Sequence, residues 1–127
     1  MRNRERPGAR RVAAVWILAM GVAGGWAFAH HGWSEYDAGK TLNLTGVSRE
    51  SAYGNPHGTI RLQVGGDKGA TWLCILAPPS RMTSRGLTAD MVKVGATVTV
   101  VGYPHKETPE EMRAERITIE GKTVELR

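Results

Sequence analysis

The chain has 127 residues, the length of one small domain with a short appendage. Its 17 Lys and Arg residues against 12 Asp and Glu give a formal charge of +5. Five Arg and one Glu fall in residues 1–29, which leaves 12 basic and 11 acidic residues in 30–127. The excess charge therefore belongs to the N-terminal segment, and the nearly neutral remainder argues against binding nucleic acid through a positive field. The single cysteine, Cys74, excludes an internal disulfide and any metal site built from several cysteines.

The N-terminal segment has the order of a secretory signal. Residues 1–11 are basic, residues 12–28 form an uncharged apolar run, and Ala27-Phe28-Ala29 places small residues at positions −3 and −1 of a cleavage site. The run has 17 residues and three glycines, whereas a stable membrane span needs about 20 apolar residues. We expect a signal helix over 1–29, a mature domain over 30–127, and a bacterial periplasmic or secreted location. A retained membrane anchor is the alternative.

Short alternating segments separated by turn signals predict strands in the mature part. They are expected at 41–48, 59–64, 70–76, 97–103, 112–119 and 122–126. Gly46 interrupts the first of them, which is typical of a bulge or a tight bend. Under strict alternation Trp72 and Cys74 share one face of the third strand, and we expect both in the core.

Residues 80–92 behave differently and separate the third strand from the fourth. Ser80 and Thr88 are candidate caps for two short helical turns. Leu87, Met91 and Val94 are spaced so that they share one helical face. Three strands, a short helix and two strands is the order of a five-stranded OB-type Greek-key barrel. The sequence therefore predicts an all-β fold, a five- to six-stranded OB-like barrel with one short helix.

Histidines are the residues that favour a specific chemistry. Cleavage before His30 would expose an α-amine whose reference pKa of about 7.7–8.0 lies well below that of lysine. The amine and ring of one histidine can chelate one metal ion, and a ring from His57 or His105 would complete a T-shaped nitrogen set, a histidine brace. Tetragonal nitrogen sites favour Cu(II), so copper is the expected metal.

A neighbouring cleavage point preserves this expectation. A cut after Ala27 would leave His30 in third place behind a free amine, an arrangement that chelates copper through backbone amides. His31 is an alternate ligand beside His30. The predicted metal ligands are thus His30, His31 and His57, and only retention of the signal would remove the amine.

The alternative interpretation assigns the histidines no metal. The ring of His57 would then bond a backbone carbonyl within a turn. Trp33 and Tyr36 would either pin the N-terminal arm to the barrel or form a surface that binds a protein or small ligand. Glu35 and Asp37, which could orient metal-binding histidines in the first interpretation, would remain solvated in this one.

No catalytic pattern appears elsewhere in the sequence. Ser-His-Asp, P-loop and dinucleotide motifs are absent, which favours a non-catalytic role over an enzyme. The acidic residues Glu107, Glu110 and Glu111 form a loop charge run that we expect on a solvated surface. A copper- and oxygen-using enzyme is the third and weakest hypothesis.

Several motifs together resemble a family of small secreted bacterial proteins catalogued as a domain of unknown function. They are His30-His31-Gly32-Trp33, residues 41–46, Asn55-Pro56-His57, Arg85-Gly86-Leu87 and residues 94–104. The resemblance implies an exported OB-like domain and brings no established activity. Gly95-Ala96 departs from the usual Gly-Asp of that pattern, and His105 is not characteristic of it. Carriage or buffering of copper, or service to a periplasmic redox or metal-handling partner, is the expected role.

Overall fold

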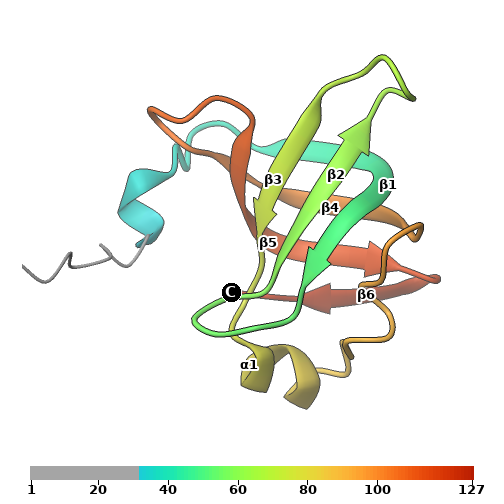
Figure 1. The fold of residues 1–127 in the computed structure, drawn as a ribbon. Coiled ribbons are helices and arrows are strands. Elements are labelled where there is room, and N and C mark those ends of the chain that lie inside the picture. The colour runs from blue at the N-terminus through green and yellow to red at the C-terminus, as the bar shows by residue number, and fades with distance from the viewer. Residues whose placement is uncertain (1–31) are drawn as a thin grey trace, which may run out of the picture.

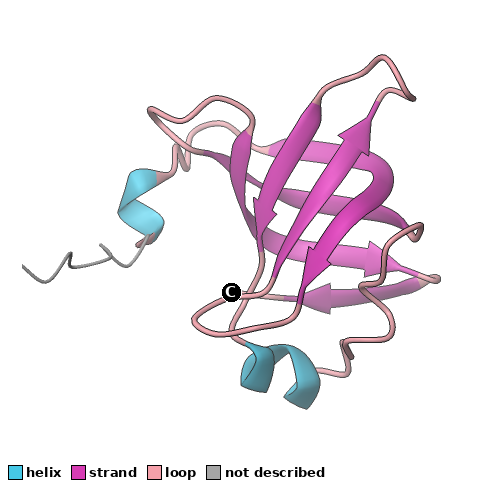
Figure 2. Cartoon of the chain, viewed as in Figure 1, coloured by secondary structure: helices cyan, strands magenta, loops and turns pink. Residues whose placement is uncertain are grey.

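A computed structural model describes residues 32–127, which form a barrel of strands with one short helix at its end (Figures 1 and 2). The elements are η1 (Trp33–Glu35), β1 (Leu42–Ala52), β2 (Thr59–Val64), β3 (Thr71–Ile75), α1 (Pro79–Ser84), β4 (Thr97–Pro104), β5 (Glu111–Ile119) and β6 (Lys122–Glu125). The predicted signal segment 1–29 and the candidate ligands His30 and His31 lie outside the described residues.

The sheet closes on itself in the OB manner. Its strand order is β3-β2-β1-β4-β5-β6, and β3 also pairs in parallel with β5. The parallel pairing places Leu73 opposite Glu111 and Ile75 opposite Arg113. Five strands therefore form the closed barrel, and β6 adds an extra strand beside β5. The predicted OB-like Greek-key barrel with one short helix is confirmed.

The core follows the alternation that the sequence shows. Every second residue of β2 and β4 points inward, so Ile60, Leu62, Val98 and Val100 are buried. Met82 of α1 is also buried in this core, and α1 lies at one end of the barrel (Figure 1). Burying apolar surface in this way contributes about 25 cal/mol per Å² removed from water.

Two expectations about the third strand are met to different degrees. Cys74 is buried in the core, as predicted. Trp72 is only partly buried, although it packs against the same core.

The segment between the third and fourth strands corrects the prediction. Gly86, with φ of 82°, follows the end of α1. Thr88 then begins a turn in which Met91 N donates to Thr88 O at 3.1 Å, and this turn stands where we expected a second short helical turn. Leu87 is buried, but Val94 is 61% exposed and does not share its face. The turn replaces the helical period, so Val92 enters the core instead.

The glycine of the first strand does not mark its bulge, although it lies where β1 passes from pairing with β4 to pairing with β2. The bulge in β1 falls between Ser48 and Glu50 and not at Gly46. A Cβ at Gly46 would lie 2.1 Å from the backbone oxygen of Gln63, so glycine is needed here because two strands approach closely. The strand also continues to Ala52, four residues beyond the predicted end.

Within residues 32–127, no helix is long and apolar enough to cross a membrane.

Candidate functional site

The segment before β1 is fastened to the ends of β4 and β5. Tyr36, 2% exposed, donates its phenol hydrogen to the Oε1 atom of Glu111 at 2.7 Å. It also forms an isolated antiparallel bridge with His105, and Asp37 N donates to Pro104 O at 2.9 Å. Tyr36 therefore pins the arm to the barrel, as one of the two sequence interpretations expected.

The burial of Glu111 corrects the expectation of a wholly solvated acidic loop. Glu107 and Glu110 are exposed, as predicted, but Glu111 opens β5 and is only 8% exposed. The phenol of Tyr36 contacts the carboxylate of Glu111 through its hydrogen bond and shields it from water. The loss of solvent around the phenol, together with the hydrogen bond to Glu111, raises the pKa of Tyr36 far above its usual range.

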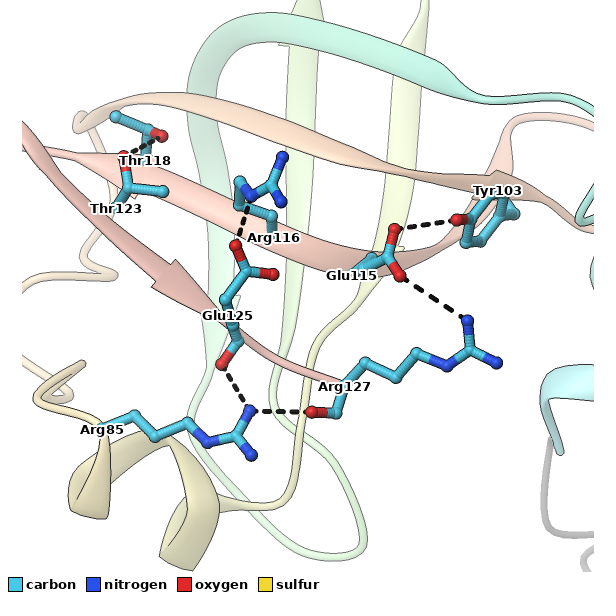
Figure 3. A network of polar contacts seen from close by, with 8 residues as sticks. All are labelled: Arg85, Tyr103, Glu115, Arg116, Thr118, Thr123, Glu125 and Arg127. Atoms are coloured by element: carbon cyan, nitrogen blue, oxygen red, sulfur yellow. Dashed lines mark hydrogen bonds and ion pairs between the residues drawn. The ribbon is translucent and has the colours of Figure 1, made fainter.

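A polar network beside β5 fixes the C-terminal arginine (Figure 3). Tyr103 donates to Glu115 at 2.8 Å, and a guanidinium nitrogen of Arg127 lies 3.6 Å from the same carboxylate. Arg85 donates at 2.8 Å to the backbone oxygens of Glu125 and Arg127. These contacts hold Arg127 near the start of the described chain.

Trp33 of η1 lies against two guanidinium groups. The central carbons of Arg113 and Arg127 are 4.9 and 4.8 Å from the Trp33 ring centroid, within the range of a cation–π contact. Tyr103 packs its ring edge-on against Trp33, with centroids 6.3 Å apart. Trp33 is thus held in place from several directions and keeps partial exposure.

Arg113 connects this arm to the β1–β2 loop. Its Nη2 atom lies 3.1 Å from the Nε2 atom of His57, and its side chain is 6% exposed. Because a guanidinium has only donors, the imidazole nitrogen must accept, and a neutral His57 ring then carries its proton on Nδ1. Desolvation, with the nearby positive charge of Arg81, lowers the pKa of Arg113. One buried guanidinium therefore touches both the candidate ligand His57 and Trp33.

His105 occupies a separate place in the β4–β5 loop. Its Nδ1 atom accepts hydrogen bonds from the backbone amides of Glu107 at 3.1 Å and Thr108 at 2.9 Å. Its ring meets Tyr36 edge-on, with centroids 5.1 Å apart. These contacts shape the loop and the arm, and one ring nitrogen is engaged by the backbone.

Asp37, one of the two acids proposed to orient a histidine, makes its side-chain contacts with neighbouring residues instead. Its carboxylate accepts from Gly39 N at 3.0 Å and lies 3.6 Å from Lys40 Nζ, so it closes a local turn. Among the residues that the structure describes, no group of three or more His, Cys, Asp or Glu side chains is arranged to hold a metal ion.

The sequence interpretation missed Arg113 and Glu111 as buried groups. Both alternate with the inward-facing Met112 and Ala114, so the pattern of β5 predicts an ordinary solvated face. Their burial comes from Trp33 and the residues after it, far away in sequence, and no local signal marks it.

Fold and site define a small OB-like barrel whose N-terminal arm is fastened across the outer face of β5. The loop that carries His57, between β1 and β2, is one of the two loops that border the ligand face of OB barrels in general. The chain belongs to the family of unknown function DUF6152, which matches residues 18–112. This confirms the expected membership of an uncharacterised domain family.

No curated protein matches the chain. A similar solved structure is the crystal structure of a complex of TiaS with a tRNA and ATP, with a TM-score of 0.47 and 20% sequence identity. The alignment covers 72% of this chain and 20% of that chain, so the present chain spans about a fifth of that protein's length.

Proposed function

We propose that the protein is exported by a bacterium and binds copper at one end of its barrel. The terminal amine and ring of His30 and the ring of His57 are the ligands, and His31 is the alternate. Copper carriage, buffering or delivery to a periplasmic redox or metal-handling partner is the role, and the protein is not itself an enzyme.

The observation that carries the proposal is that the side chain of Arg113 contacts both His57 and Trp33. It touches His57 by a hydrogen bond and Trp33 by a cation–π contact. Trp33 follows His30 by three residues, and three extended residues reach about 10 Å. This reach supports a terminal amine that meets the β1–β2 loop.

The donor set also suits copper. One amine and two imidazoles form a nitrogen site, and copper leads the affinity order of the divalent ions at such sites. The metal would supply redox chemistry to a partner, while His30 and His57 would hold it. While Arg113 donates to Nε2, a neutral His57 ring holds its proton on Nδ1, so binding of copper by this ring would have to displace either the guanidinium or that proton.

Export is supported by the order of basic, apolar and small residues in 1–29. The family match begins at residue 18, inside the apolar run, so the shared pattern includes part of this segment. The alternative role, an interaction module, depends on an aromatic surface at Trp33 and Tyr36. The burial of Tyr36 removes it from that surface and weakens the alternative.

A copper titration tests the proposal. The chain that begins at His30, with its first residue verified by mass spectrometry, is titrated with Cu(II) against a competing chelator. His57→Ala should weaken binding at least tenfold. His105→Asn is the matched control, because it keeps an acceptor for the loop amides and should leave the affinity unchanged. Equal affinity in the wild type and His57→Ala would remove His57 from the site.

A further inference from the structure

A hollow lies on the outer face of the barrel, where β1, β2 and β3 run side by side (Figure 1). Its volume of about 210 Å³ corresponds to about seven water molecules, which is enough for one sugar-sized ring. The residues that line it come from all three strands and are Glu50, Ser51, Ala52, Thr59, Arg61 and Leu73. None of them is a ligand of the proposed copper site.

The strand register explains why these residues meet. Glu50 lies opposite Arg61 in the pairing of β1 with β2, and Arg61 lies opposite Leu73 in the pairing of β2 with β3. The row faces away from the core, because Leu62, the next residue along β2, points inward. The bulge of β1 falls between Ser48 and Glu50, and bulges next to binding sites commonly re-aim a side chain.

The charged groups of the hollow balance each other. The Nε atom of Arg61 lies 3.2 Å from the Oε2 atom of Glu50, and both side chains are exposed to solvent. The pair presents hydrogen-bond donors and acceptors next to each other and carries no net charge. A ligand that is itself neutral can therefore use both kinds of group while the ion pair stays intact.

The other lining residues add hydroxyl groups and apolar surface. The hydroxyl of Ser51 donates to the backbone oxygen of Val92, which leaves its oxygen able to accept from a ligand. The hydroxyl of Thr59 can donate or accept. Leu73 is a large apolar residue that remains partly exposed in the hollow. A matching ligand carries hydroxyls around its edge and CH groups on its faces.

We propose that this hollow binds a neutral oligosaccharide, with one sugar ring on Leu73 and its hydroxyls against Glu50 and Arg61. A sugar hydroxyl both donates and accepts, so neighbouring hydroxyls can bond the carboxylate and the guanidinium together. An anionic ligand would have to compete with Glu50 for the guanidinium. The faces of strands 2 and 3 bind oligosaccharides or oligonucleotides in OB barrels generally, and the phosphates of an oligonucleotide find no net positive charge here.

A titration followed by nuclear magnetic resonance tests the binding. The mature chain, residues 30–127, is titrated to millimolar concentrations of cellotetraose and, separately, chitotetraose, two neutral β-linked tetrasaccharides. We expect at least one of them to move the backbone amide signals of residues 50–52, 59–61 and 73 together. No shift with either probe, or shifts confined to other parts of the barrel, would overturn the proposal.

Two variants and a matched control test the residues. Arg61→Ala should weaken binding of the sugar at least tenfold, and Leu73→Ala should weaken it at least threefold. Arg116→Ala is the control, because Arg116 also pairs with a glutamate of a neighbouring strand, Glu125, but does not line the hollow. The side chains of Arg61 and Arg116 are 47% and 46% exposed, so both variants should keep their fold. Equal weakening in these two variants would overturn the proposed site.

Charged and peptide probes distinguish the occupant. Binding of the neutral sugar should change little between low and high salt, because no net charge is screened. Tighter binding of tetragalacturonate or of a short oligonucleotide would overturn the choice of a neutral ligand. Tighter binding of an uncharged, end-blocked tetra-alanine would assign the hollow to a peptide and would also overturn it. The titrations contain no metal, so failure of copper binding would leave their outcome unchanged.

Discussion

The phenol of Tyr36 donates a 2.7 Å hydrogen bond to the carboxylate of Glu111, a residue 75 positions later in the chain. Both side chains are almost completely buried. This bond fastens the arm that precedes β1 to the first residue of β5, and so it fixes where the chain approaches the barrel.

Loss of this hydrogen bond should cost stability. Tyr36→Phe removes the donor and leaves a buried carboxylate oxygen short of a partner, which costs about 1–3 kcal/mol. Chemical denaturation of the mature domain would measure the free energy of unfolding. Tyr103→Phe is the control, because its partner Glu115 is more exposed and also pairs with Arg127, so the loss should be smaller. Equal losses in the two variants would contradict a special role for Tyr36.

Alkaline pH should destabilise the domain through Cys74. Burial raises the pKa of the Cys74 thiol from 9.0 to about 12, so the folded state keeps a proton that the unfolded chain releases. The contribution is complete below pH 9 and is lost as pH rises towards 12, with a slope of about 1.4 kcal/mol per pH unit. The phenol of Tyr36 adds to the loss above about pH 10, because its pKa is also raised.

Denaturation midpoints of the wild type and Cys74→Ala between pH 7 and 11 would check this. The variant should be less stable at neutral pH, because it leaves a small cavity, but its stability should fall less steeply above pH 9. Parallel pH profiles would show that Cys74 does not govern the alkaline loss.

Close strand packing at Gly46 gives a third test. The Cβ of an alanine there would collide with the backbone oxygen of Gln63, and the shift needed to relieve it should cost about 1–3 kcal/mol. Gly54→Ala is the matched control, because nothing lies within 4 Å of the new Cβ and its effect should stay within about 0.5 kcal/mol. Thermal unfolding of both variants distinguishes them. A stable Gly46→Ala variant would mean that the strands can separate locally at little cost.

The barrel was predictable because its signal is local. Alternation in residues 59–64 matches β2 (Thr59–Val64) residue for residue. The end of β1 was missed because residues 49–52 are polar or small and exposed, so no apolar alternation marks them, although residues 50–52 pair with β2. Backbone pairing continues there after the buried face has ended.

The candidate site was only half predictable. His57 stands out by residue type and by its place beside a turn. Arg113 does not, because an arginine on the polar face of a strand normally remains in water. Only the long-range contact with Trp33 and the β1–β2 loop turns it into a buried neighbour of the candidate ligand.

The most direct test concerns the terminal amine of His30. Two chains are compared by Cu(II) competition titration, one that starts at His30 and one with a single Met before it. We predict that the chain starting at His30 binds copper at least tenfold more tightly, because the added residue separates the amine from the histidine ring. Equal affinity in the two chains would contradict it.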